Sequence, residues 1–342
     1  MSGEARALWF AAPRVAELRP ASAPPPGPGE VRVRTLASAP SGGTEMLVYR
    51  GQVPADLPLD LPTLEGSFGF PVKHGYAAVG CVQDTGDGVE ALAPGDTVFV
   101  HHPHQSVFTV PESLPVRLPG GLDAEHGVFA ANLETAVNIV HDTPLHLGET
   151  AVVFGQGVVG LLVVQLLRLA GAGRVLAVDP LENRRELAHA VGADEALRPD
   201  GDLGTRVLSL TDGRGADIAV EASGSGAALA AAIESVATEG TVVVASWYGS
   251  EQVALPLGGN FHRGRVTLRS SQVGRLSPGL VPRWDHARRM QTVLDLLGDP
   301  RMVLWPLVSH RIPFGEAPGA YRMIDERPEE TVQVILTYDE EP

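Results

Sequence analysis

A glycine-rich loop in the middle of the chain joins an apolar strand to an apolar helix, and this arrangement constrains the fold most strongly. The segment ETAVVFGQGVVGLL spans residues 149–162, and its glycines fill a G-x-G-x-x-G pattern. In this context the first glycine allows a tight turn, the second lets the backbone approach a pyrophosphate, and the third lets the helix pack closely. The helix N-terminus then presents free N–H groups to the phosphates. We therefore predict a dinucleotide site made by Gly155, Gln156, Gly157, Val158 and Gly160.

The second half of the chain alternates short apolar strands with helices. Strand-like runs occur at 151–154, 174–178, 217–220 and 241–246, and helical runs at 131–140, 158–169, 182–191 and 227–237. Nearly all-apolar strands that alternate with helices predict a parallel sheet with both faces covered. A further strand from Val266, a helix from Trp284 to Leu297 and a final strand at 331–338 complete the expected elements.

The first third of the chain is rich in proline and glycine and contains short β-like runs. Residues 31–36 alternate apolar and polar side chains, as a half-buried strand does, and the preceding APPPGPG is typical of a loop. The turn Pro94-Gly95-Asp96 precedes a strand at 97–100. These closely spaced turns and strands predict a compact, barrel-like β domain.

Length and charge narrow the class of protein. A chain of 342 residues suits two domains, and a net charge of −15 makes nucleic acid and membrane surfaces poor partners. The single cysteine, Cys81, excludes an internal disulfide and a cysteine-rich zinc lobe. The segment MSGEARALWF does not have the pattern of a signal peptide, and the most apolar helical run is too short to span a bilayer. We expect a cytoplasmic protein that acts on a small molecule.

An acidic residue follows the glycine loop at the spacing that ribose recognition requires. The next strand ends in VLAVDP, which places Asp179 24 residues after Gly155. A carboxylate there accepts hydrogen bonds from both adenosine ribose hydroxyls and repels a 2′-phosphate, so NAD(H) is favoured. Arg184 and Arg185 follow closely and leave NADP(H) possible. The alternative for Asp179 is a helix N-cap in the strand-to-helix loop.

Five motifs occur together in a recognisable order: SGGTE at Ser41, GYAAVG at Gly75, PGDTV at Pro94, GQGVVG at Gly155 and EASGSG at Glu221. Over nearly its whole length the chain therefore resembles the medium-chain dehydrogenase/reductase superfamily, which is alcohol dehydrogenase-like. The resemblance implies an α/β oxidoreductase with a GroES-like, β-rich catalytic domain at 1–130 and 272–342. It also implies a doubly wound Rossmann NAD-binding domain at 131–271 and a homodimer formed through its edge strands.

The zinc-ligand positions of that superfamily hold other residues here. Zinc members carry a cysteine before Gly-Thr-Asp, and a histidine and a glutamate in a Gly-His-Glu motif. The matching positions are Gly42, Tyr76 and Ala77, and the third ligand position corresponds to Ala131. Because catalytic zinc needs three protein ligands, the comparison predicts a protein without zinc.

Three closely spaced histidines could replace the missing zinc ligands: His101, His102 and His104. Neighbouring residues at a strand end point to opposite faces, so a solvated or hydrogen-bonded loop is the better interpretation. The short H-P-H-Q loop, the S-x-G-T-E motif and the G-Y pair resemble a zinc-free branch of the bacteriochlorophyllide dehydrogenase type.

Without zinc, a side chain must handle the proton at the substrate oxygen. By position in the family, Tyr76 could donate its phenolic proton, Glu45 could orient or ionise that phenol, and Thr44 could relay protons. His74 is the side chain best matched to neutral pH. Each has a structural alternative: Tyr76 fills the space of the metal, Thr44 and Glu45 cap a helix, and His74 is a loop histidine.

Further cofactor contacts are predicted at the carboxyl edge of the parallel sheet, where ligands bind in such folds. These are Ser223, Ser246, Trp247, Ser271 and Gln272. The segment RWDHARR at 283–289 is expected to begin a helix with a solvated polar face, and Asn132 and Glu134 are expected near the domain junction.

These features predict a zinc-independent, NAD(H)-dependent oxidoreductase that interconverts a secondary alcohol and a ketone in the interdomain cleft. Two alternatives stay open. An enone or quinone reductase adds hydride to an activated double bond without a metal, usually from NADPH, which Asp179 disfavours. A nucleotide-binding regulator would keep the fold without catalysis.

Overall fold

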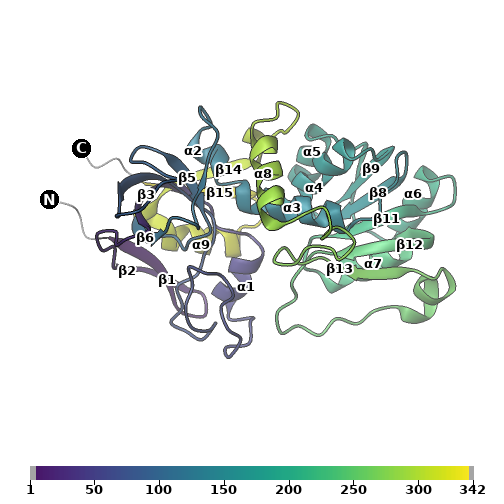
Figure 1. The fold of residues 1–342 in the computed structure, drawn as a ribbon. Coiled ribbons are helices and arrows are strands. Elements are labelled where there is room, and N and C mark those ends of the chain that lie inside the picture. The colour runs from purple at the N-terminus through teal and green to yellow at the C-terminus, as the bar shows by residue number, and fades with distance from the viewer. Residues whose placement is uncertain (1–4, 339–342) are drawn as a thin grey trace. The chain divides into compact units, whose positions relative to one another are not determined.

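Two large sheets organise the chain, and each belongs to a different unit (Figure 1). The computed structural model describes residues 5–338. Unit 1 comprises residues 1–131, 294–300 and 304–342, and unit 2 comprises residues 132–293 and 301–303. The expected α/β fold, with one β-rich part and one parallel-sheet part, is confirmed.

Unit 1 is built on a mainly antiparallel sheet with the order β14-β15-β3-β4-β5-β7, in which β6 also pairs with β3. Buried valines alternate with half-buried arginines along β3, as the sequence pattern predicts for a strand with one face in the core. Val31 and Val33 pack there against Val98 and Phe108. The strands are β3 (Glu30–Ser38), β4 (Ala78–Thr85), β5 (Thr97–Val100), β6 (Val107–Pro111), β7 (Val116–Arg117), β14 (Val308–Pro313) and β15 (Gln333–Thr337).

A hairpin and several helices complete unit 1. The helix α1 ends at Gly51, whose φ of 71° is the left-handed conformation that glycine favours at a helix end. The second core of the unit joins α1 to α9 through aromatic rings, and Tyr321 meets Phe10 edge-on at a centroid distance of 5.0 Å. The elements are β1 (Arg6–Ala12), β2 (Val15–Pro20), α1 (Thr44–Arg50), α2 (Ala124–Gly127), η2 (Trp305–Leu307), η3 (Phe314–Glu316) and α9 (Ala317–Glu326).

Unit 2 contains a parallel sheet with the order β10-β9-β8-β11-β12-β13. Every residue of the central strand β8 is buried, which explains why all of its residues after Thr150 are apolar. The strands are β8 (Thr150–Phe154), β9 (Arg174–Val178), β10 (Glu195–Leu197), β11 (Ala216–Glu221), β12 (Val236–Val244) and β13 (Thr267–Ser270). The helices are α4 (Val158–Leu169), α5 (Glu182–Ala190), α6 (Leu203–Leu210), α7 (Gly226–Ser235) and η1 (Leu257–Phe261), with α3 (Ala130–Asp142) and α8 (His286–Leu297) lying mostly in this unit.

The end of unit 2 differs from the sequence expectation. Residues 272–293 were assigned to the first domain, but they lie in unit 2. The physical reason is Arg289 of α8, which is 1% exposed and bonded to side chains of α3. The expectation of a solvated polar face at 283–289 is therefore wrong at Arg289.

Within residues 5–338, no helix is long and apolar enough to cross a membrane.

Candidate functional site

The glycine loop between β8 and α4 has the geometry that its pattern predicts. Gly155 has a φ of 89°, and a Cβ atom there would lie 2.7 Å from the Cα of Ser223. A Cβ on Gly160 would lie 1.8 Å from the carbonyl oxygen of Gly155. A Cβ on Gly157, in contrast, would meet no described atom within 4 Å. Packing therefore requires two of the glycines, while the third leaves an open face for a ligand to approach the backbone.

The N-terminus of α4 begins at this open face. Gly157 is its N-cap, and no described side chain caps it. The first N–H groups of a helix have no partner within the helix and carry a positive dipole end. Gly155, Gln156, Gly157, Val158 and Gly160 thus form a cradle that fits the phosphates of a dinucleotide.

Asp179 is tied to the same loop. Its Oδ2 accepts from the backbone N–H of Gln156 at 2.7 Å, its Oδ1 accepts from that of Leu181 at 2.9 Å, and the residue is 2% exposed. In this structure Asp179 therefore binds the backbone N–H groups of Gln156 and Leu181. A hydrogen bond between Asp179 and the ribose hydroxyls of a cofactor stays a prediction. A guanidinium nitrogen of Arg184 lies 4.0 Å from Oδ2, and Arg185 donates to the carbonyl oxygen of Asp179.

Glu221 organises the neighbouring loop at the end of β11. Its Oε1 accepts from Ser223 N–H at 2.7 Å, from Ser223 O–H at 2.6 Å and from Gly224 N–H at 3.0 Å, and its Oε2 accepts from Tyr248 O–H at 2.7 Å. Burial and the carboxylate of Glu221 raise the pKa of Tyr248. Ser246 accepts from Gly224 N–H. The predicted cofactor residues Ser223 and Ser246 thus shape the loop whose backbone packs on Gly155.

Ser271, at the end of β13, takes part in a buried polar network. Its hydroxyl donates to Asp142 Oδ2 at 2.8 Å and accepts from Asn138 at 3.2 Å. Asn138 also accepts from Arg289, which donates twice to Glu134. The network joins α3, β13 and α8 inside unit 2. Of the remaining predicted cofactor contacts, Trp247 is 37% exposed and Gln272 is exposed.

In unit 1, Glu45 is a carboxylate that is completely buried. Its Oε2 lies 3.0 Å from His104 Nε2 and accepts from the hydroxyl of Tyr321. Its Oε1 accepts from Ser41 N–H at 3.2 Å. Burial alone would raise the pKa of Glu45, but the charge and hydrogen bond of His104, together with His74 and Tyr321, outweigh burial and lower it. Glu45 is therefore ionised at neutral pH.

The other three predicted catalytic residues, Thr44, His74 and Tyr76, lie around this carboxylate. Thr44 precedes Glu45 on α1, and its hydroxyl and that of Ser41 hydrogen-bond Tyr76. Burial, followed by the charge of Glu45, raises the pKa of Tyr76 despite these two bonds. The ring centroid of His74 lies 6.0 Å from that of Tyr76.

His74 itself is 4% exposed, and its Nδ1 has no hydrogen-bond partner among the described residues. Burial lowers the pKa of His74, although Glu45 acts in the opposite direction. The imidazole is therefore neutral at neutral pH, and Tyr76 is the only one of these four side chains that combines an ionisable proton with partial exposure.

A second set of residues supports the carboxylate from other strands. His104 Nδ1 lies 2.8 Å from Ser38 Oγ, which lies 2.9 Å from the hydroxyl of Tyr338. His104 was not predicted from the sequence as a partner of Glu45, and neither were Ser38, Tyr321 and Tyr338. The H-P-H-Q loop was the available signal for His104, but its histidines were interpreted as part of a solvated or hydrogen-bonded loop, with no partner predicted for any of them.

The other two histidines of that loop turn elsewhere. His101 Nδ1 lies 3.1 Å from the carbonyl oxygen of Tyr76. His102 Nδ1 lies 2.8 Å from the carbonyl oxygen of Pro103, and its ring stacks on Phe108 at 3.7 Å. No group of three or more histidine, cysteine or acidic side chains in the described part of the chain is arranged to hold a metal ion. The residues at the zinc-ligand positions do not fit zinc, because Gly42, Ala77 and Ala131 have no side-chain atom that could bind a metal.

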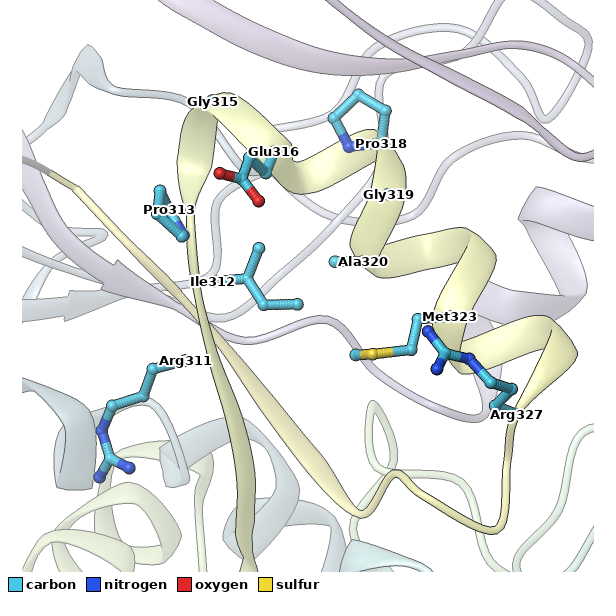
Figure 2. A pocket seen from close by; sticks show the side chains of 10 residues that line it. All are labelled: Arg311, Ile312, Pro313, Gly315, Glu316, Pro318, Gly319, Ala320, Met323 and Arg327. Atoms are coloured by element: carbon cyan, nitrogen blue, oxygen red, sulfur yellow. The ribbon is translucent and has the colours of Figure 1, made fainter.

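A separate cavity of about 530 Å³ lies in unit 1 between β14 and α9 (Figure 2). Ile312 and Met323 supply apolar surface, and Arg311 and Arg327 stand at its edges. Arg311 pairs with Glu125 and Arg327 with Glu330. Met323 lies two residues from Tyr321, so the cavity is on the side of α9 that faces away from Glu45.

Known proteins match this chain in sequence and in fold. A family model described as "Zinc-binding dehydrogenase" matches residues 158–297. D-guloside 3-dehydrogenase of Escherichia coli K12 is 28% identical over 90% of this chain and 93% of its own. L-threonine 3-dehydrogenase of Pyrococcus furiosus is 30% identical over 66% of this chain and 71% of its own.

Solved structures agree with the fold. 2R,3R-butanediol dehydrogenase of Bacillus subtilis superposes with a TM-score of 0.81 at 22% identity, covering 98% of this chain and 100% of its own. A Sinorhizobium meliloti protein described as a zinc-binding dehydrogenase, solved with bound NADP, gives a TM-score of 0.78 at 21% identity over 98% and 100% of the two chains.

The chain has the fold of a dehydrogenase-type α/β protein. This class combines a β-rich unit with a parallel-sheet unit that contains a glycine-rich loop. The chain belongs to the medium-chain, zinc-binding-type dehydrogenase family. It is therefore an oxidoreductase, and the non-catalytic alternative is set aside.

Proposed function

We propose that this protein is a zinc-independent, NAD(H)-dependent oxidoreductase that interconverts a secondary alcohol and a ketone. The observation that carries the proposal is the ionised Glu45, which accepts hydrogen bonds from Ser41, His104 and Tyr321 and lies beside Tyr76, whose phenol is hydrogen-bonded to Ser41 and Thr44. The alcohol dehydrogenase relatives support the alcohol–ketone chemistry.

Tyr76 handles the proton in this proposal. In ketone reduction its hydroxyl donates to the carbonyl oxygen as negative charge develops there, and in alcohol oxidation the phenolate accepts the proton. Because burial and Glu45 raise the pKa of Tyr76, the phenol stays protonated at neutral pH. This protonation state favours the reductive direction. Thr44 and Ser41 hold the phenol by hydrogen bonds and fix its orientation.

The cofactor is held by the cradle in unit 2. The backbone at Gly155, Gly157 and the start of α4 receives the pyrophosphate, and Asp179 lies at the ribose end of the site. A bound nicotinamide supplies the hydride. The carboxylate of Asp179 disfavours a 2′-phosphate, which supports NAD(H) over NADP(H).

A second candidate is an NADPH-dependent enone or quinone reductase. One observation favours it: both oxygens of Asp179 already accept backbone hydrogen bonds, and Arg184 lies 4.0 Å away. A guanidinium there is suited to a 2′-phosphate. The two candidates differ in cofactor, so fluorescence titration with NADH and NADPH separates them. Tighter binding of NADH by at least tenfold supports the first, and the reverse order supports the second.

The test of function compares the protein with its Tyr76→Phe variant on a panel of secondary alcohols, ketones and enones. We expect ketone turnover with NADH, a kcat lowered by about 10²-fold in Tyr76→Phe, and unchanged NADH binding. Full activity of Tyr76→Phe would contradict the proton role, and turnover of enones alone would contradict the substrate class. Homodimerisation stays a prediction that light scattering tests.

A further inference from the structure

Glu221 is a buried side chain at the carboxyl edge of the parallel sheet in unit 2. It is 0% exposed and ends β11, which lies between β8 and β12. In the strand register it is opposite Phe154, which directly precedes the glycine loop, and opposite Val244 at the end of β12. Glu221 therefore lies beside the phosphate cradle, at the edge where ligands bind in such sheets.

The first loop that Glu221 contacts follows β11 and packs against the glycine loop. Glu221 Oε1 accepts from the N–H and O–H groups of Ser223 at 2.7 and 2.6 Å, and from Gly224 N–H at 3.0 Å. A Cβ atom on Gly155 would lie 2.7 Å from the Cα of Ser223. These hydrogen bonds therefore hold the backbone against which the tight turn at Gly155 packs.

The second loop follows β12, the neighbouring strand. Tyr248 O–H donates to Glu221 Oε2 at 2.7 Å, and Ser246 Oγ accepts from Gly224 N–H at 2.8 Å. Burial and the carboxylate of Glu221 raise the pKa of Tyr248, so its hydroxyl keeps the proton that it donates. Two hydrogen bonds thus tie the second loop to the first, and one of them ends on Glu221.

The contacts of Glu221 differ from those of a polar group that only stabilises a core. The four hydrogen bonds that its carboxylate accepts from described residues all come from loops, outside the helices and strands. Loop backbone has no ladder of its own and depends on such side-chain acceptors. Removal of this acceptor leaves several donors without a partner, so the loops shift toward other hydrogen bonds.

We infer that Glu221 is a positioning residue of the cofactor site, which holds the loop at 223–225 against Gly155 and, through Tyr248, the loop at 246–248. The inference rests on the proposed function, because it takes the glycine loop to bind the pyrophosphate of NAD(H). The first loop supports the pyrophosphate end of the site. The second loop supports the part of the cofactor beyond the pyrophosphate, so the two effects are separable.

The first experiment measures calorimetric binding of NADH and of ADP, which has the adenosine and pyrophosphate but no nicotinamide. Glu221→Ala releases both loops, so the Kd values for NADH and ADP should both rise by about tenfold or more. Tyr248→Phe releases only the second loop, so the Kd for NADH should rise about three- to tenfold and that for ADP less than about twofold. Wild-type binding of both ligands by Glu221→Ala would overturn the inference.

A matched control separates positioning from stability. Gln165 of α4 is also buried, and its side chain makes hydrogen bonds with the backbone of Leu161 and Val303. It lies about two helical turns beyond Gly157. Gln165→Ala and Glu221→Ala should both lower the Tm, but only Glu221→Ala should weaken the binding of ADP. If the two variants lose the same affinity for NADH and ADP, Glu221 acts through stability alone and the inference fails.

A conservative variant covers the case in which Glu221→Ala does not fold. In Glu221→Gln the amide oxygen can accept from Ser223 and Gly224, and the amide nitrogen can donate to the oxygen of Tyr248. Both loops keep their partners, so the Kd values for NADH and ADP should stay within about threefold of wild type. A folded Glu221→Gln that loses binding of both ligands by about tenfold or more would overturn the inference, and so would wild-type NADH binding by Tyr248→Phe.

The outcomes also separate this inference from the proposed function. If NADH binding depends on Glu221 but Tyr76→Phe is fully active, the proton role of Tyr76 fails while the role of Glu221 stands. If activity depends on Tyr76 but Glu221→Ala binds NADH and ADP as wild type does, only the inference fails. Wild-type protein that binds neither NADH nor NADPH would contradict both.

Discussion

Gly75 and His104 are in contact at a position where no other residue type fits: a Cβ on residue 75 would lie 2.8 Å from His104 Cδ2 and 3.2 Å from His104 N. The φ of 137° at Gly75 is also unfavourable for any side chain. Both the contact with His104 and the backbone conformation therefore require glycine at position 75, directly before Tyr76.

The Gly75→Ala variant should therefore lose both stability and activity. The strained backbone costs about 1–3 kcal/mol of unfolding free energy, and the contact displaces His104 from Glu45. Gly88→Ala is the matched control, because Gly88 has a φ of 81° but no atom within 4 Å of an added Cβ. It should lose about 1 kcal/mol and keep its kcat. Urea denaturation and steady-state kinetics measure both, and equal activity of the two variants would contradict the role of the contact.

Two glycines of the cofactor loop should respond in opposite ways. Gly157→Ala places a methyl group in open space, so the unfolding free energy should stay within about 0.5 kcal/mol. The same methyl group blocks a pyrophosphate, and we expect the Kd for NADH to rise at least tenfold, or about 1.4 kcal/mol.

Gly160→Ala is the counterpart, because its Cβ would lie 1.8 Å from Gly155 O. This variant should be destabilised by about 1–3 kcal/mol or more before any ligand is added. Thermal unfolding with and without NADH distinguishes the two effects. If Gly157→Ala binds NADH as tightly as wild type does, the cofactor does not lie against this face.

Acid should destabilise the protein partly through His102. Burial lowers the pKa of His102 to about 3, from an ordinary value of 6.5 for histidine. Between these two pH values the unfolded chain binds a proton at His102 and the folded chain does not. The contribution of the neutral His102 to the unfolding free energy is therefore present above about pH 6.5 and is lost as the pH falls toward 3. The full loss amounts to about 5 kcal/mol.

In the variant His102→Gln, the unfolding free energy should fall less steeply as the pH is lowered. The change in slope should correspond to the uptake of about one proton fewer on unfolding. His146→Gln is the control, because the His146 side chain is 81% exposed. Urea midpoints between about pH 4 and 8 provide the measurement. Parallel acid limbs in wild type and His102→Gln would show that His102 is not the group responsible.

The buried arginine of α8 should be costly to truncate. Arg289→Met leaves the carboxylate of Glu134 buried beside α3 without its cation, and we expect a loss of about 3–5 kcal/mol. Arg288→Met should lose less than about 1 kcal/mol, because Arg288 is exposed and lies over the Trp284 ring. The double change Arg289→Met/Glu134→Leu should recover part of the loss. Equal stability of the two single variants would contradict the assigned network.

The fold was predictable because its signals are local. The apolar strand before Gly155, the helix after it and the alternation along β3 each arise from residues close in sequence. The order of the motifs also predicted that Thr44, Glu45, His74 and Tyr76 lie near one another, and in the structure they do.

The partners of Glu45 were not predictable in this way. Tyr321 lies 276 residues from Glu45, and Tyr338 lies 300 residues from Ser38. These contacts form only because α9 and β15 lie near α1 and β3 in the folded unit. The periodicity of apolar residues along the chain does not predict such long-range neighbours. The burial of Arg289 depends in the same way on α3. The closely spaced histidines at 101, 102 and 104 likewise gave no indication that His104 would be the one in contact with Glu45.

The central claim is that the phenol of Tyr76, held beside the buried carboxylate of Glu45, handles the proton without a metal, and zinc dependence tests it most directly. The measurement is ketone reduction by NADH in protein whose zinc content is determined by mass spectrometry, before and after dialysis against a chelator. The account predicts substoichiometric zinc and a kcat unchanged by the chelator or by added zinc. One tightly bound zinc per chain, with activity lost on its removal and restored on its return, would contradict it.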